Sequence, residues 1–97
     1  MRIVIKGAVR KMCPYKNEVD LGSVEFTFDI TEGDGPELHE LAATLAEFPD
    51  WSVSHEGFTR SLFDTWSTAG LVRVETTWTT AGLDVTVTAG ESDSLLR

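Results

Sequence analysis

The sequence predicts an α+β domain in which four strands form an antiparallel sheet and two helices cover one face, in the order β-β-α-α-β-β. Apolar residues alternate with polar ones in the outer parts of the chain, which is typical of half-buried strands. In the middle they recur at helical spacing, and strands that flank a helix pair favour the α+β class. The 97 residues suffice for one core, so we expect one domain over residues 1–90 and a flexible tail over 91–97.

The first half of the chain contains two predicted strands. Residues 3–9 are mostly apolar and indicate the first, and residues 23–30 alternate clearly enough to indicate the second. Between them, Pro14 opens a polar stretch that we interpret as an irregular loop carrying Cys13 and Asp20. Taken alone, Asp20 is predicted to be a turn residue.

Two amphipathic helices are predicted next. Pro36 suits the first turn of a helix, and the helical spacing continues until Pro49 stops it. Ser52 or Ser54 can cap a second helix, which ends near Gly70. The predicted buried positions are Leu38, Leu41, Ala42, Leu45 and Phe48 in the first helix and Phe58, Leu62, Phe63 and Trp66 in the second.

Two strands complete the predicted order. Residues 71–78 and 83–88 are rich in valine and threonine, and residues 79–82 between them suit a hairpin. No stretch approaches membrane-spanning length, and residues 1–7 are too short in apolar residues for a signal peptide. A single cysteine excludes an internal disulfide, so we expect a cytoplasmic protein that is held together by packing.

The acidic composition limits the class of partner. The chain has 16 Asp+Glu against 8 Lys+Arg, which gives a formal net charge of -8. This charge repels a phosphate backbone, so direct binding to a nucleic acid is not expected, and a small molecule or a protein fits better. Solubility and a salty host environment both explain the acidity, and neither indicates a function.

Cys13 and Asp20 are the residues that suggest catalysis. A thiolate is a strong nucleophile, and an aspartic acid can supply a proton beside it. Cys13 is followed by Pro14 in a polar segment with Lys11 and Lys16 nearby, and neighbouring cations favour the thiolate form. The alternative is that Cys13 is an inert buried hydrophobe, which is the more common role of a lone cysteine.

His55 and Glu56 at the start of the second helix have two interpretations, which the residues leave open. The helix dipole alone favours an acid in the first turn, but a carboxylate there can also accept two hydrogen bonds from a guanine-like base. His39 and Glu40 look like a solvated face, and no third ligand stands at useful spacing, so no metal site is predicted. Residues 33–35 lack the strand-loop-helix context of a phosphate loop.

Together these features resemble the nitrile reductases of queuosine synthesis (QueF) and their non-reducing relatives, which share the tunnelling fold (T-fold) with GTP cyclohydrolases. The resemblance spans residues 3–90 and rests on Cys13-Pro14 with Asp20 seven positions later, Glu37-Leu38, His55-Glu56, Arg60, Leu71–Val74 and the final hairpin. It implies a T-fold. It also implies a ring-forming homo-oligomer whose sites lie between subunits.

The resemblance also implies a role for each candidate residue. Cys13 would add to the nitrile carbon of 7-cyano-7-deazaguanine and form a thioimide, while Asp20 acts as general acid. Glu56 would hold the base, and His55 would assist in placing the substrate or a proton. These roles agree with the chemistry, because a weakly electrophilic nitrile needs both a thiolate and protonation of its nitrogen.

The chain departs from the reductases where they bind NADPH. Their first helix opens with a lysine-rich segment, whereas Glu37–Ala43 contains no lysine, and its acids would repel phosphates. The stretch Thr80–Leu83 also lacks their arginine followed by glycines. We therefore expect no cofactor and an amidinotransferase-like reaction, as in archaeosine formation, in which ammonia converts the thioimide to an amidine.

Three alternatives stay open at this point. The first is an NADPH-dependent reductase with an altered cofactor site. The second is a virus-type relative that acts on another 7-substituent, for example by decarboxylating 7-carboxy-7-deazaguanine. The third is a small non-catalytic binding module in which Cys13 is inert. The substrate can be the free base or a base within a nucleic acid, and the acidity of the chain favours the free base.

Overall fold

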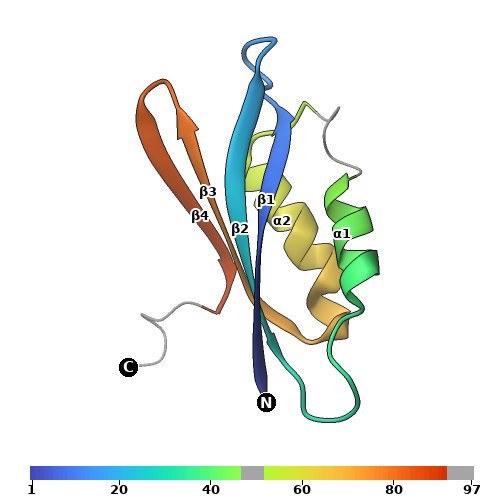
Figure 1. The fold of residues 1–97 in the computed structure, drawn as a ribbon. Coiled ribbons are helices and arrows are strands. Elements are labelled where there is room, and N and C mark those ends of the chain that lie inside the picture. Colours follow the sequence, from blue (N-terminus) through green and yellow to red (C-terminus); the bar gives the residue numbers. More distant parts are fainter. Residues whose placement is uncertain (47–51, 92–97) are drawn as a thin grey trace.

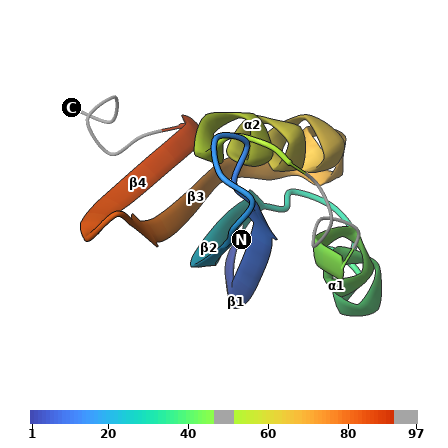
Figure 2. The ribbon, with the colours of Figure 1, turned by 90° about the horizontal axis from the view of Figure 1, so that it is seen from above.

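The computed structural model describes residues 1–46 and 52–91. Its four strands form one antiparallel sheet in the order β1-β2-β3-β4, with both helices on the same side (Figures 1 and 2). This confirms the predicted α+β class and the predicted order. The elements are β1 (Arg2–Met12), β2 (Val19–Asp29), α1 (Leu38–Ala46), α2 (His55–Trp66), the 3-10 helix η1 (Ser67–Ala69), β3 (Leu71–Thr80) and β4 (Leu83–Gly90).

The first two strands are longer than the sequence predicted. β1 continues to Met12 and β2 begins at Val19, so Asp20 lies inside a strand, directly opposite Lys11. The prediction that Asp20 is a turn residue in an irregular loop is therefore wrong. The reason is that two charged residues, Lys11 and Asp20, occupy helix-facing positions where a strand pattern normally shows apolar ones.

Helix α1 begins at Leu38, two residues after Pro36, because Glu37 caps it. The Glu37 carboxylate accepts hydrogen bonds from the backbone N–H of His39 at 3.1 Å and of Glu40 at 2.8 Å. The pKa of Glu37 is lowered, first by the hydrogen bond from the His39 side chain and then by these backbone bonds. The acid at this position therefore stabilises the N-terminus of α1.

Helix α2 is capped by the second of the two predicted serines. The Ser54 hydroxyl accepts a hydrogen bond of 3.0 Å from the backbone N–H of Gly57. At its other end α2 continues into η1, and the chain then turns through Gly70, whose φ of 96° is left-handed. The predicted end near Gly70 is confirmed, and a glycine is favoured there because other residues resist that conformation.

The core lies between the sheet and α2. Its buried residues are Val9, Val24, Phe26, Phe28, Ile30, Leu41, Phe58, Leu62, Trp66, Leu71, Val74 and Trp78, and Leu45 and Phe63 are partly buried against them. Leu38 and Ala42 are exposed, contrary to the prediction, because α1 lies beside the β1 edge rather than over the sheet (Figure 2). Phe48, Pro49 and the tail residues 92–97 lie outside the described residues.

The predicted hairpin between β3 and β4 turns through two residues of positive φ. Thr80 pairs with Leu83, and φ is 55° at Ala81 and 77° at Gly82. Alanine resists the left-handed conformation, whereas asparagine is favoured at the first position of such a turn. We expect Ala81→Asn to raise the free energy of unfolding by about 0.5–1 kcal/mol in urea denaturation. Ala81→Val, the control, should lower it, because a β-branched residue is more strained there.

Candidate active site

One pocket brings together the residues that the sequence singled out. Cys13, Asp20, His55 and Glu56 all line it, although they come from the β1–β2 loop, β2 and α2. Its volume is about 200 Å³, and its complete lining is Lys11, Cys13, Pro14, Tyr15, Asp20, Ser54, His55, Glu56 and Thr80. Among the larger hollows, two of about 410 and 240 Å³ lie along α1 and contain none of the four candidates, and another of about 240 Å³ over the β1–β2 loop contains Cys13 alone of the four.

The hairpin register turns Cys13 toward the helix side of the sheet. Lys11 lies opposite Asp20, and the Cys13 backbone N–H donates to the Glu18 carbonyl at 2.8 Å, so the pairing continues past the ends of both strands. Because side chains alternate along a strand, Lys11 and Cys13 face the same side, and Asp20 faces it from β2. The thiol is half-buried, so Cys13 is not a fully enclosed hydrophobe.

Backbone contacts hold the start of α2 against this loop. Ser52 forms a parallel bridge with Met12, and the Val53 N–H donates to the Met12 carbonyl at 3.2 Å. The helix begins three residues after Ser52, so its first turn lies beside the end of β1. This contact explains why His55 and Cys13, far apart in the sequence, share a pocket.

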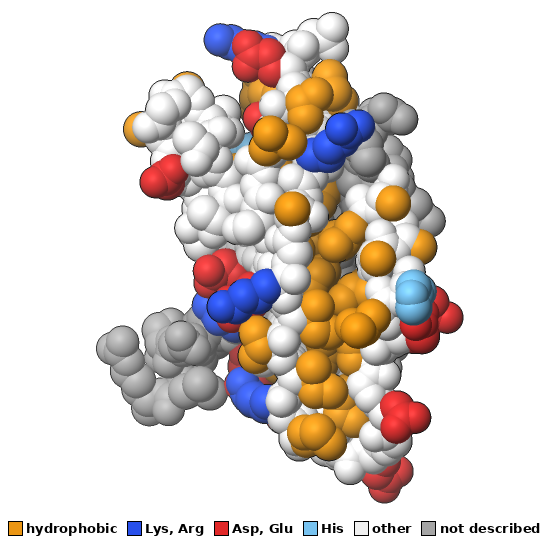
Figure 3. Space-filling view, in the orientation of Figure 1, with side chains coloured by type: hydrophobic (Ala, Val, Ile, Leu, Met, Phe, Trp, Pro, Cys, Tyr) orange, Lys and Arg blue, Asp and Glu red, His pale blue; other side chains and the backbone are white. Residues whose placement is uncertain are grey.

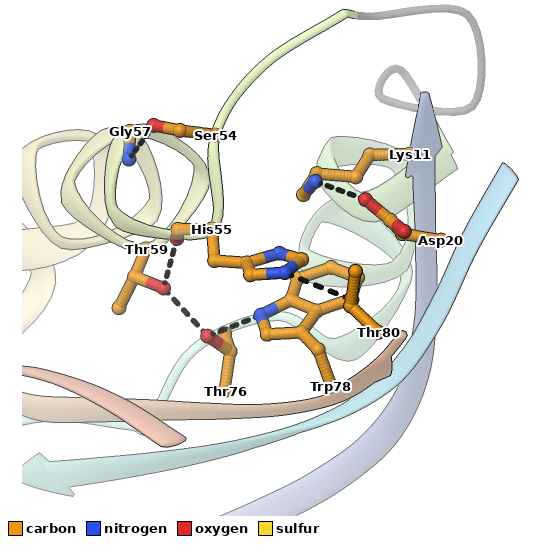
Figure 4. Close-up of polar contacts among 9 residues, drawn as sticks. All are labelled: Lys11, Asp20, Ser54, His55, Gly57, Thr59, Thr76, Trp78 and Thr80. Carbon is orange, nitrogen blue, oxygen red and sulfur yellow. Dashed lines mark hydrogen bonds and ion pairs between the residues drawn. The ribbon is translucent and has the colours of Figure 1, made fainter. Parts of the chain in front are cut away.

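Lys11 and Asp20 form a buried ion pair in the pocket wall (Figure 4). The Lys11 Nζ lies 2.7 Å from the Asp20 Oδ2, and the two side chains are 0% and 7% exposed. Nζ also lies 5.0 Å from the centroid of the Trp78 ring, whose electron-rich face attracts a cation. In the sequence Lys11 stood out only as a cation near Cys13, and its pairing with Asp20 depends on a register that was not predicted.

The His55 ring lies flat against Trp78 at the same pocket. The ring centroids are 5.0 Å apart with 14° between the planes, and the His55 Nε2 lies 3.1 Å from the Thr80 Oγ1 (Figure 4). The other ring nitrogen, Nδ1, is buried and has no hydrogen-bond partner among the described residues. Buried polar atoms without a partner are uncommon in folded proteins, so this nitrogen is a notable feature of the site.

A chain of hydrogen bonds fixes Trp78 to the first turn of α2 (Figure 4). The Thr59 hydroxyl donates to the His55 carbonyl at 2.8 Å, so it can only accept from the Thr76 hydroxyl at 2.6 Å. The Trp78 indole N–H then donates to Thr76 at 2.9 Å. Sequence reasoning missed both threonines, because in a strand or a helix they look like ordinary surface residues.

Glu56 lies at the mouth of the pocket and is exposed. Its carboxylate makes no hydrogen bond or ion pair within the described part of the chain, so it is free to accept hydrogen bonds from a ligand. Tyr15, which sequence reasoning did not single out, lies on the same pocket lining and is 87% exposed. Arg60, on α2, is exposed and does not line the pocket.

Burial and charge lower the pKa of His55 below its usual 6.5. Burial is the largest cause, the Lys11 ammonium adds to it, and Asp20 and Glu56 oppose it. Since the unfolded chain then binds more protons, we expect the free energy of unfolding to fall as pH drops below 6.5 toward the folded-state pKa. The contribution of His55 is below about 1.4 kcal/mol per pH unit.

Urea denaturation between pH 5 and 8 measures this effect. His55→Gln should reduce the slope of unfolding free energy against pH, and an unchanged slope would contradict the assignment. His39→Gln, at an exposed position on α1, is the control, because it measures how much the chain's other histidine contributes to that slope.

The described residues offer no other site of this kind. Among them no group of three or more His, Cys, Asp or Glu side chains could hold a metal ion. No helix in residues 1–46 and 52–91 is long and apolar enough to cross a membrane.

Comparison with solved structures shows a likeness over most of the chain. No protein-family profile and no curated protein sequence matches the chain. Among solved structures it is similar to the crystal structure of the archaeosine synthase QueF-Like in the apo form, with a TM-score of 0.77 and 20% sequence identity. The likeness covers 91% of this chain and 90% of that chain. The chain therefore has a QueF-like tunnelling fold, as the sequence predicted.

Proposed function

We propose that the chain is a QueF-like, 7-deazaguanine-modifying enzyme that uses Cys13 as a covalent nucleophile on 7-cyano-7-deazaguanine. The observation that carries the proposal is the single pocket in which Cys13 meets Asp20, His55 and Glu56. Its occurrence on a fold shared with the QueF-like archaeosine synthase supports the same class of substrate. A half-buried thiol among these charged groups suits nucleophilic chemistry better than packing.

In the first step the Cys13 thiolate forms a sulfur–carbon bond with the nitrile carbon. One electron pair of the carbon–nitrogen triple bond moves to nitrogen, which takes a proton delivered by Asp20, and the product is a thioimide. The neutral His55 ring, with its unpartnered Nδ1, helps to place the substrate or a proton. Protonation during the addition prevents an uncompensated negative charge on nitrogen.

Glu56 is proposed to hold the base. Its free carboxylate at the pocket mouth can accept two parallel hydrogen bonds, one from the ring N–H and one from the exocyclic amine of a deazaguanine. Hydrogen bonds to a charged acceptor contribute about 1.5–3 kcal/mol each. Glu56→Gln should therefore slow adduct formation about 10-fold or more at subsaturating substrate. Glu40→Gln, which changes an exposed acid in the first turn of α1, should have no such effect.

Ammonia is proposed to complete the reaction without NADPH. It attacks the thioimide carbon, one of its protons moves to the imide nitrogen, and the carbon–sulfur bond breaks. The Cys13 thiolate is released and the product is a protonated amidine. Glu37 and Glu40, both exposed at the start of α1, stand where the reductases carry lysines, and their charges would repel a phosphate-bearing cofactor. The net charge of -8 acts in the same direction.

Copies of the chain are proposed to assemble edge to edge into a ring. β1 and β4 are the edge strands of the sheet, and Leu83 on β4 is 67% exposed. Figure 3 shows a band of apolar side chains between β1 and α1, where the hollow of about 410 Å³ lies. Open edges and apolar patches of this kind are what subunit contacts cover. Native mass spectrometry would give the subunit count, and a monomer would contradict the assembly.

Intact-mass measurement tests the covalent step. Incubation with 7-cyano-7-deazaguanine should add the mass of one nitrile to the wild-type chain and nothing to Cys13→Ala. Circular dichroism confirms that the variant is folded. If the wild type gives no adduct, the proposal fails and a non-catalytic binding role is favoured.

Three further incubations decide the outcome of the reaction. Ammonium should release an amidine product and regenerate the free enzyme. NADPH oxidation in the presence of the nitrile would instead identify a reductase. Loss of carbon dioxide from 7-carboxy-7-deazaguanine, with no turnover of the nitrile, would identify a decarboxylase.

A further inference from the structure

Lys11 is a fully buried charge in the pocket wall to which the proposed mechanism gives no role. It lies between Asp20 and the face of Trp78, and its side chain is 0% exposed. Burying an ammonium is costly unless it is paired, so its presence beside the candidate acid calls for an explanation. We propose that Lys11 is the proton reservoir for the addition to the nitrile, and that Asp20 relays its proton. This inference rests on the proposed function.

The direction of the hydrogen bond supports the proposal. A lysine ammonium has donors and no acceptor, so the Asp20 oxygen at 2.7 Å must accept, and the proton between the two belongs to Lys11. Asp20 in this pair is an ionised carboxylate rather than an acid that already carries a proton. The transferable proton that lies next to the Asp20 carboxylate is therefore the one on the Lys11 Nζ.

The burial of the pair sets the order of the relay. Both residues line the pocket, but the Lys11 side chain is 0% exposed and that of Asp20 is 7% exposed, so the carboxylate is the member that a ligand can reach more readily. A short charge-assisted hydrogen bond is a suitable path for a proton. Lys11 therefore acts through Asp20, as a positioning and proton-supplying residue.

The transfer balances in atoms and charge. The nitrile nitrogen takes a proton from Asp20 as the sulfur–carbon bond forms, and Asp20 takes one from the Lys11 Nζ. The thiolate becomes the sulfur of a neutral thioimide, the ammonium becomes a neutral amine, and Asp20 is a carboxylate before and after. The other titratable groups that line this pocket are Cys13 and Tyr15 from the loop and His55 and Glu56 from α2. From β3, the uncharged Thr80 lines the pocket and the Trp78 ring lies against Lys11.

Two substitutions of Lys11 test the relay. Lys11→Arg keeps a cation beside Asp20, but a guanidinium does not release its proton, so adduct formation should slow about 100-fold or more at every pH. Lys11→Met removes this proton source, so Asp20 can donate a proton only while it is itself protonated. The adduct rate of this variant should approach that of the wild type in acid and fall about tenfold per pH unit once the lone carboxyl ionises.

Alkylation of Cys13 by iodoacetamide is the control, because this reaction needs a thiolate but no proton donor. Lys11→Arg, which keeps the cation, should alkylate within about threefold of the wild-type rate, and it suffices if Lys11→Met does not fold. Adduct rates and pH profiles like those of the wild type in both variants would overturn the relay. A loss of alkylation as large as the loss of adduct formation would also overturn it, because it would show that Lys11 acts by stabilising the Cys13 thiolate. A wild type that alkylates but gives no nitrile adduct would overturn the proposed function, and the relay with it.

Discussion

Lys11→Met is expected to lower the free energy of unfolding by about 3–5 kcal/mol, because it leaves the Asp20 carboxylate buried without its cation. The pair is enclosed and short, with 2.7 Å between Nζ and Oδ2. Asp20→Val should lower the free energy of unfolding by a similar amount, because it leaves the Lys11 ammonium buried without a partner. The double variant Lys11→Met/Asp20→Val removes both charges at once, so it should be close to the wild type in stability. Urea denaturation of the four proteins completes the double-mutant cycle.

The same hairpin contains a matched control pair. Lys6 lies opposite Glu25 on β1 and β2, just as Lys11 lies opposite Asp20, but its Nζ is 3.7 Å from the carboxylate and 74% of the Lys6 side chain is exposed. The cycle Lys6→Met/Glu25→Gln should give a coupling of about 0.2–1 kcal/mol. Equal couplings for the two pairs would show that burial does not strengthen the Lys11–Asp20 pair.

Trp78→Ala is the second substitution with a large expected effect, about 3–5 kcal/mol of unfolding free energy. Trp78 is 1% exposed, stacks on His55, and packs edge-on against Phe58 with ring centroids 5.1 Å apart. It also lies under the Lys11 ammonium. The total free energy of unfolding of a domain is about 5–15 kcal/mol, so this loss should lower the urea midpoint strongly. It should also slow the nitrile adduct, because His55 and Lys11 lose their support.

Trp66 and Trp78, the two buried tryptophans among the described residues, offer a control for the hydrogen bond of Trp78. Its indole N–H donates to Thr76, whereas the buried indole N–H of Trp66 has no partner among the described residues. Phenylalanine removes the same atoms from either. Trp78→Phe should therefore cost about 1 kcal/mol more than Trp66→Phe in urea denaturation. An equal loss of unfolding free energy in the two variants would show that the hydrogen bonds that link Trp78 to His55 add little to stability.

The candidate residues could be selected from the sequence because their chemistry is local. A lone cysteine, an acid seven positions later and a His-Glu pair at a helix start are visible as residue types. Their meeting in one pocket required the bridge between Met12 and Ser52, which joins segments far apart in the chain. No periodicity signals such a contact, because it is formed by backbone groups that every residue carries.

The sequence by itself determined the α+β class, the order of the elements and the end near Gly70, and it narrowed the cap of α2 to Ser52 or Ser54, because hydrophobic periodicity and end signals act over a few residues. Only the tertiary structure decided that Asp20 lies in a strand beside Lys11 and that Trp78 supports the pocket. Strand register and burial depend on partners far along the chain. A charged residue that is buried with its partner leaves the same sequence pattern as an exposed one.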